Sequence, residues 1–233
     1  MNLLELKDRI KYYFESPSDL TDTQIIFAVN SARKAAEQRY AFEMNKRVLQ
    51  VSVDLRTGAD WTALKVLNTT KPAYRVRNIK RAYIMSADGL GFTPIDFAYK
   101  NLLEFPHPDT TVLVGSEPIA ATADIRKLYI VGPTVYFYPF GEAGVVSNVA
   151  FDAYIWQPDY KVDFETEDWM LMHGHEYLFW KTLWELNFKK KEWVPRQEGN
   201  LQLSADNAEM AFRNMVVWDG TLKGGMTSLN ENL

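Results

Sequence analysis

Residues 173–188 read HGHEYLFWKTLWELNF, and this stretch decides which fold the chain adopts. Its large apolar side chains, with Leu171 just before them, cover nearly the whole circumference of a helix. A helix that is apolar on every side must be buried on every side. We therefore predict a helix from about Glu167 to Lys190 that packs inside a bundle and offers its remaining surface to a neighbouring subunit. The residues predicted to lie in the core or the subunit interface are Tyr177, Trp180, Trp184 and Phe188.

The two histidines of this stretch do not form a metal-binding pair. Residues two apart on a helix point about 200° away from each other, so His173 and His175 cannot share a metal while both are helical. His173 and Glu176 are three apart, but no second pairing of this kind supplies further ligands. The acidic residues between Asp163 and Asp168 are typical of a helix N-terminus. The sequence thus predicts no metal, no cofactor and no catalytic residue, and a protein that is not an enzyme.

Further helices are predicted at both ends of the chain. Thr21 and Gln24 have capping-box spacing and begin a helix from about residue 21 to 42, and a shorter helix covers about residues 2–14. Ser204 is the expected N-cap of the last helix, which Asp219-Gly220 is expected to end. We predict that residues 1–46 and 159–218 form a helical bundle, followed by a flexible tail at 219–233.

The middle of the chain, residues 47–158, has the pattern of strands. RVLQVSVDL (47–55) alternates apolar and polar positions, and LYIVGPTVYFYPF (128–140) has two strand-like runs hinged at Gly132-Pro133. NVAFDAYIWQP (148–158) gives another strand. The predicted fold class is therefore α+β: a bundle made from both ends of the chain, with a central antiparallel β-sandwich or open barrel inserted into it.

Composition narrows the function classes. A net charge of −4 over 233 residues argues against a general nucleic-acid binder, and the lack of cysteine excludes disulfides and thiolate metal sites. Charged residues interrupt the N-terminus, and no window holds about 20 apolar residues, so we expect a soluble protein made in a cytoplasm, without a membrane partner. Aromatic residues make up 14% of the chain, a surplus that favours subunit contacts.

The order of segments from about 129 to 218 resembles the adaptor, or head-to-tail connector, proteins of short-tailed bacteriophages. The resemblance rests on YIVGPTVYFYPF, the strand FDAYIWQPDY, the helix start TEDW, the helix EYLFWKTLWELNF and a final helix ending in MVVWD. The N-terminal helix IIFAVNSARKAAEQRY also fits. These features cover more than half of the chain but are a pattern of element order and composition.

This resemblance implies a structural virion protein at the portal vertex, assembled in the host cytoplasm. Such proteins form a ring, usually of twelve subunits, between the capsid portal and the tail or nozzle protein, and DNA passes through the ring without specific binding. The resemblance also implies that the C-terminal segment docks on the portal. The predicted portal-binding residues are Trp218, Leu222, Met226, Leu229 and Leu233.

An alternative function comes from the aromatic residues of the β segment. They would form a carbohydrate-binding face of a phage tail component if their rings were exposed, whereas alternating aromatics in strands more often belong to the core of a sheet. The residues concerned are Tyr129, Tyr136, Phe137, Tyr138, Phe140, Tyr154 and Trp156.

Overall fold

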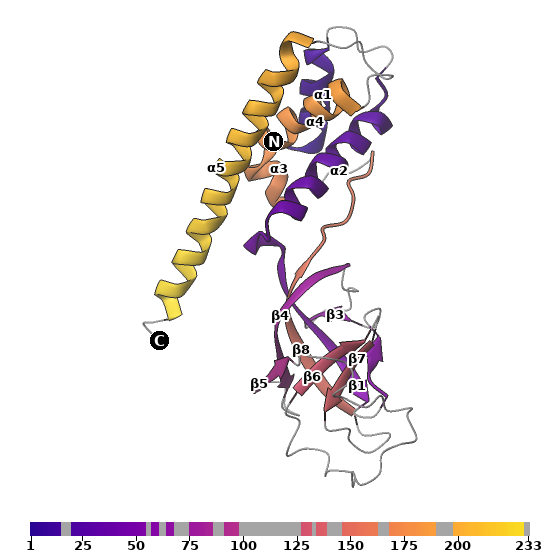
Figure 1. Ribbon diagram of the computed structural model, residues 1–233, viewed down its shortest axis with the longest axis vertical. Coiled ribbons are helices and arrows are strands. Elements are labelled where there is room, and N and C mark those ends of the chain that lie inside the picture. Colours follow the sequence, from indigo (N-terminus) through magenta and orange to yellow (C-terminus); the bar gives the residue numbers. More distant parts are fainter. Residues whose placement is uncertain are drawn as a thin grey trace. The chain divides into compact units, whose positions relative to one another are not determined.

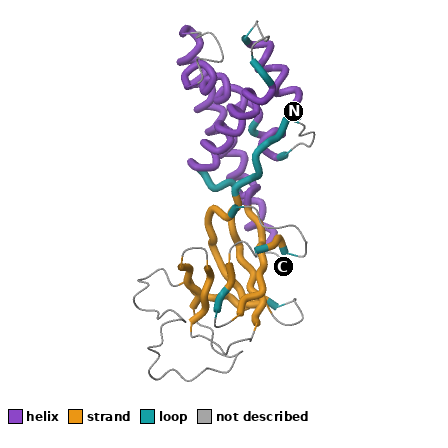
Figure 2. The backbone as a smooth tube through the Cα atoms, turned by 90° about the vertical axis from the view of Figure 1, so that its right-hand side faces the viewer, coloured by secondary structure: helices purple, strands orange, loops and turns teal. Residues whose placement is uncertain are grey.

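The computed structural model describes residues 1–14, 20–54, 57–60, 64–67, 75–85, 91–97, 127–131, 134–138, 146–162, 168–189 and 198–230. The chain divides into two compact units, one made of Met1–Met44 with Pro158–Leu233 and the other of Asn45–Gln157. The first unit is helical and the second is made of strands (Figures 1 and 2). The predicted α+β class, with helices from both ends of the chain and strands between them, is confirmed.

The described part of the helical unit contains five α-helices: α1 (Leu3–Tyr13), α2 (Asp22–Arg39), α3 (Trp169–His173), α4 (His175–Lys189) and α5 (Glu198–Asn230). Both N-terminal helices begin with a capping box. The side chains of Asn2 and Thr21 accept from the backbone N–H groups of Glu5 and Gln24, whose side chains accept from the cap residues in return. The box predicted at Thr21 is therefore confirmed.

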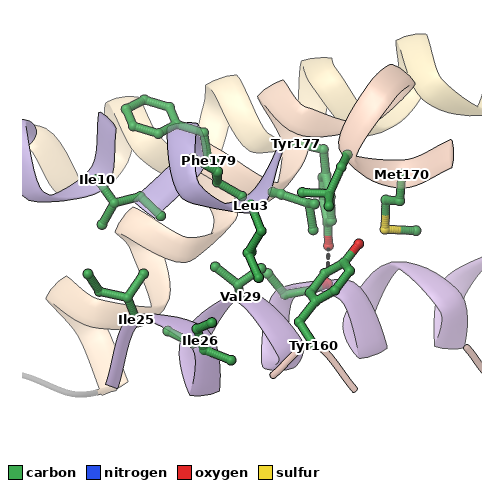
Figure 3. Packing of buried hydrophobic residues seen from close by; sticks show 14 of the residues in the cluster. Leu3, Ile10, Ile25, Ile26, Val29, Tyr160, Met170, Tyr177 and Phe179 are labelled. Carbon is green, nitrogen blue, oxygen red and sulfur yellow. Dashed lines mark hydrogen bonds between the residues drawn. The ribbon is translucent and has the colours of Figure 1, made fainter. Parts of the chain in front are cut away.

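The core of the helical unit is formed by apolar faces of α1, α2 and α4. Figure 3 shows Leu3 and Ile10 of α1, Val29 of α2 and Tyr177 of α4 between these helices, as members of one buried cluster. Tyr177 is buried, and its hydroxyl donates a hydrogen bond of 3.1 Å to the carbonyl of Ala32. A buried phenol with a partner for its hydroxyl is a stable component of a core. The aromatic stretch quoted above thus supplies one wall of this core.

The prediction of one continuous helix from Glu167 to Lys190 is wrong, because the chain forms two helices that meet at Gly174. The carboxylate of Asp168 caps α3 by accepting from Leu171 N–H at 2.8 Å. Gly174 then ends α3, and a Cβ at this position would lie 2.6 Å from Met215 Sδ. The Met215 side chain of α5 lies close to Gly174, so a larger residue at this position would force that side chain to move.

The predicted limits of the last helix are also wrong. The helix begins at Glu198, and Ser204 is a buried residue within it. It continues through Asp219 and Gly220 to Asn230. The buried carboxylate of Asp219 accepts two hydrogen bonds from Glu43 N–H, at 2.9 and 3.0 Å. Since Asp219 is engaged in this long-range contact, it does not act as a local stop signal; the flexibility of residues 219–233 stays a prediction.

Within its described residues the β unit contains eight strands: β1 (Lys46–Asp54), β2 (Ala59–Asp60), β3 (Lys65–Val66), β4 (Val76–Met85), β5 (Phe92–Phe97), β6 (Lys127–Val131), β7 (Thr134–Tyr138) and β8 (Val146–Ile155). Their order in the sheet is β2-β7-β6-β5-β4-β8-β1-β3. The pairs are antiparallel except for β5 with β6. The predicted hairpin at 128–140 is confirmed by the pairing of β6 with β7, and its turn at 132–133 lies outside the described residues.

The sheet curls around its own apolar core. Leu49 and Val53 of β1 and Phe151 of β8 are fully buried in it. Gly58 bridges to Asp54 at the end of β1, immediately before β2 pairs with β7 at the far end of the strand order. Gly58 has φ +80°, and a Cβ there would lie 2.4 Å from the Val135 carbonyl oxygen. The strand order is that of one sheet, and the choice between a sandwich and an open barrel stays a prediction.

Candidate assembly surfaces

Two of the four residues predicted for a core or interface belong mainly to the core of the helical unit. Tyr177 is buried between α2 and α4. Trp180 is partly buried and packs against the same core, with its ring 5.0 Å from that of Phe179 in an edge-to-face contact. These two rings stabilise the subunit itself.

The other two residues form a pair of rings at the C-terminal end of α4. Trp184 and Phe188 stack with their centroids 5.1 Å apart, and the ammonium group of Lys181 lies 3.6 Å from the centre of the Trp184 ring. Trp184 is half-buried, while 55% of Phe188 is exposed. A stacked aromatic pair with one exposed member offers apolar contact area that needs little further ordering.

A second apolar surface lies along α5 and was missed in the sequence. Leu203, Met210 and Val217 are 50%, 59% and 67% exposed and are spaced by seven residues, close to two helical turns, so they line up on one side of the helix. We call these three residues the α5 stripe. The residues facing the other way are buried in the helical unit: Ser204, Ala208, Phe212, Met215 and Asp219. The seven-residue spacing is visible in the sequence, but the predicted helix began only at residue 204 and so excluded Leu203.

Trp218, predicted to bind a portal, packs within the helical unit. Its ring stacks on His173 with the centroids 4.0 Å apart and on Trp169 at 6.3 Å. Leu222 is half-buried on α5. Met226 and Leu229 lie in the helical backbone of α5, with side chains outside the described set, and Leu233 is outside the described residues altogether.

The structure separates the histidines of the opening stretch. His173 belongs to α3 and stacks on Trp218, whereas the Nδ1 atom of His175 on α4 lies 3.2 Å from the Met172 carbonyl oxygen. Across the described residues, no three His, Cys, Asp or Glu side chains come close enough to hold a metal ion. None of the described helices is both long and apolar enough to cross a membrane.

Glu176 joins α4 to α1 through an ion pair. Its two carboxylate oxygens accept from the Arg9 guanidinium at 2.6 and 3.2 Å, and that guanidinium also lies 3.9 Å from the centre of the Phe179 ring. Hydrogen bonds from Arg9 hold the pKa of Glu176 below its usual value. The ion pair between Arg9 and Glu176 therefore has a structural role, because it joins α1 to α4.

A buried polar network holds the segment that returns from the β unit to the helices. Asn30 of α2 makes two hydrogen bonds with the Tyr160 backbone, at 2.8 and 3.0 Å. The fully buried Arg33 pairs with Asp159 at 3.2 Å and lies over the Tyr160 ring. The Tyr160 hydroxyl donates to Asp168 at 2.8 Å, and burial raises the pKa of Tyr160. These contacts tie Asp159 and Tyr160 to α2, and Tyr160 to the N-cap of α3.

Three of the seven aromatic residues considered for a sugar-binding face have described side chains, and none of the three is fully exposed. Tyr136 and Tyr154 are buried. Trp156 is half-buried, with the Arg77 guanidinium 5.3 Å from its ring centre. The side chains of Tyr129, Phe137 and Tyr138, and the whole of Phe140, lie outside the described set.

Comparison with known proteins does not assign the chain to a family. No family model matches the sequence, and no curated protein matches it significantly.

Proposed function

We propose that this protein is a structural subunit of a tailed-phage virion, which forms an adaptor ring between the capsid portal and the tail or nozzle and extends the DNA channel. The observation that supports the proposal is that α5 has apolar residues on two opposite faces. One side of the helix is buried in the helical unit, and the other carries the exposed α5 stripe. The proposal describes a building block and not an enzyme.

Ring assembly requires each subunit to present two different surfaces to its two neighbours. The α5 stripe and the Trp184–Phe188 pair are two apolar surfaces on different helices. We assign the α5 stripe to the contact with a neighbouring subunit because its three side chains are aligned and at least half exposed. The aromatic surplus of the chain supports the same assignment, since rings are enriched in interface cores. A ring of twelve is the number implied by the resemblance.

The C-terminal part of α5 is the proposed portal-binding element. Leu222, Met226, Leu229 and Leu233 are spaced by four, three and four residues, which is the pattern of one helical face. Because the backbone is helical as far as Asn230, the first three of these residues fit the mode in which an amphipathic helix lies in a groove of its partner. Trp218, packed on His173, marks where α5 is still held by its own subunit.

The test is electron microscopy of the purified protein, alone and mixed with a portal from a matching phage. We expect rings alone or an added layer on the portal. Met210→Ser with Val217→Ser should prevent ring formation, whereas Asp206→Ser with Asn214→Ser, at exposed polar positions of the same helix, should not. Deleting residues 220–233 should abolish portal binding and leave the subunit folded. Monomers that assemble neither alone nor on the portal would contradict the proposal.

The alternative, a carbohydrate-binding module of a phage tail component, has less support. A sugar-binding face needs exposed rings, and Tyr136 and Tyr154 are buried. Trp156 is the one half-buried ring among the described members of that set, and Arg77 lies over it. A monomer that binds glycan arrays would favour this alternative over the ring.

A further inference from the structure

The two units carry net charges of opposite sign. The helical unit has 14 Lys and Arg against 20 Asp and Glu, a net charge of −6, while the β unit has 12 against 10, a net charge of +2. The net charge of −4 for the whole chain therefore does not describe the β unit, which is basic. An argument against nucleic-acid binding from the net charge applies to the helical unit only.

The basic residues of the β unit are concentrated at β4. Residues 75–81 read RVRNIKR, which places four cations in seven positions with no acidic residue among them. We call Arg75, Arg77, Lys80 and Arg81 the β4 basic strip. In a regular strand successive side chains point to opposite faces, so Lys80 and Arg81 would be separated.

Two irregularities in the pairing of β4 with β8 change this distribution. The register moves from Val76↔Ile155 to Asn78↔Tyr154, and again from Ile79↔Ala153 to Arg81↔Asp152. Each shift leaves one extra residue on β4, first Arg77 and then Lys80. A bulge places two residues of one strand opposite a single residue of its partner. The extra residues at both bulges are cations.

The contacts of these side chains place them on the outer face of the sheet. Val76, Ile79 and Ala82 pack on the apolar core of the β unit. The Lys80 ammonium lies 4.8 Å from the Tyr154 ring centre, and the Arg77 guanidinium lies over Trp156. Tyr154 pairs with Lys46 of β1 on the face opposite Leu49, which is buried inside. Arg75, Lys80 and Arg81 are exposed.

The acidic residue nearest this strip along the sheet is largely compensated. Asp152 of β8 pairs with Arg81 in the register and makes an ion pair of 3.1 Å with Lys46 of β1. Lys46 and the four cations of the β4 basic strip therefore surround this described carboxylate. Two of the cations lie over aromatic rings, which hold their charged ends at the outer face of the sheet.

We propose that the β4 basic strip contacts the phosphate backbone of double-stranded DNA without reading its sequence. Because the two bulges place Arg75 to Arg81 opposite only Trp156 to Asp152 of β8, the strip covers about 13 Å at roughly 3.3 Å per residue. One strand of B-DNA carries a phosphate about every 3.4 Å over that length, so each cation can reach one. Tyr154 is buried beneath Lys80 and offers no face for stacking on bases. The inference concerns one β unit and does not rest on ring assembly.

The experiment is fluorescence anisotropy of a labelled 30-base-pair duplex titrated with the full-length protein over a series of salt concentrations. The test variant is Lys80→Gln with Arg81→Gln. The control is Lys161→Gln with Arg213→Gln, two exposed cations of the helical unit whose loss changes the net charge equally. Circular dichroism checks that both variants are folded, and Lys80→Arg with Arg81→Lys keeps the charge.

We expect wild type, the control and the charge-keeping variant to bind with the same salt dependence. The test variant should bind more weakly, with the slope of log K against log salt reduced by about 2, because each phosphate contact contributes about 0.9. The proposal is overturned if wild type does not bind the duplex at low salt, or if the two Gln variants lose affinity equally. It is also overturned if poly-glutamate at equal charge concentration displaces the duplex, since the partner is then an acidic polypeptide.

Discussion

At the residue scale, single polar side chains join segments that are distant in the sequence. Asp219 of α5 accepts from the backbone of Glu43, and Asn30 of α2 holds the backbone of Tyr160. A buried backbone group left without a partner costs about 1–3 kcal/mol, so each of these side chains stabilises the junction it serves. Neither contact could be predicted from the sequence, because the residues of each pair lie more than a hundred positions apart.

Asp22 contributes to the acid stability of the helical unit through one cluster of ion pairs. Its carboxylate is paired with the ammonium groups of Lys11 and Lys7, which hold its pKa below the usual value. A lowered folded-state pKa contributes stability that is present above the unfolded pKa of about 3.9 and is lost as pH falls through the folded value. Asp22→Asn should therefore destabilise the protein at pH 7 by about 1 kcal/mol, and by much less near pH 3.

Urea unfolding at pH 7, 5 and 3 measures this difference. Asp8→Asn is the control, since it removes the same charge from an exposed position of α1 and should have little effect at any of these pH values. An equal loss of stability by Asp22→Asn at pH 7 and pH 3 would show that the cluster does not titrate in this way.

At the scale of elements, the sequence predicts which segments are helices and strands better than where they end. The change from a period of 3.6 to one of 2 near residue 47 locates the β unit, and the capping box at Thr21 locates α2. The helix ends depend on contacts from elsewhere in the fold. Gly174 separates α3 from α4 because Met215 packs against it, and Asp219-Gly220 stays helical because Asp219 binds Glu43.

For the candidate surfaces, too, the sequence predicts the residue types better than it predicts which side chains stay exposed. The aromatic residues of α4 could be predicted, but which of them stay exposed could not, because α2 and α5 decide it. The α5 stripe has a spacing that is visible in the sequence, yet it is recognisable only once α5 is known to start at Glu198. The β4 basic strip depends on two bulges, and these arise from the pairing with β8 and leave no local signal.

Substitutions at two glycines test these helix limits: Gly220 lies in α5, and Gly174 lies between α3 and α4. The two substitutions should change the free energy of unfolding in opposite directions. A Cβ at Gly220 meets no atom within 4 Å, and the residue lies inside an exposed stretch of helix. Gly220→Ala should therefore stabilise this part of α5 by roughly 0.5–1 kcal/mol. A Cβ at Gly174 would lie 2.6 Å from Met215 Sδ and 3.0 Å from the Met170 carbonyl, so Gly174→Ala should destabilise the unit by about 1–3 kcal/mol.

Amide hydrogen exchange at residues 216–225, together with thermal unfolding of both variants, measures these effects. Slower exchange in Gly220→Ala agrees with a continuous helix. Faster exchange in that variant would mean that Gly220 adopts the left-handed conformation of a helix end, which only glycine reaches without strain, and that α5 stops where the sequence pattern suggested.

At the scale of the whole molecule, the β unit is an insertion with its own core. The chain enters it at Asn45 and leaves it at Gln157, and the side-chain amide of Gln157 donates to Asn45 at 3.0 Å. Lys46 and Tyr154 are partners in the β1–β8 ladder. Because entry and exit lie side by side, removing the insertion leaves two chain ends that a short linker can join.

We therefore expect each unit to fold without the other. Residues 45–157 expressed alone should give a β-type circular dichroism spectrum and a cooperative unfolding transition. Residues 1–44 joined to 158–233 by six Gly and Ser residues, which reach about 20 Å when extended, should give a helical spectrum. The helical fusion retains the α5 stripe and should still assemble, whereas the β unit retains the β4 basic strip and should still bind the duplex. If either piece is unfolded, the two cores depend on each other; if the helical fusion is folded but binds DNA as well as the full chain does, the basic strip is not the binding surface.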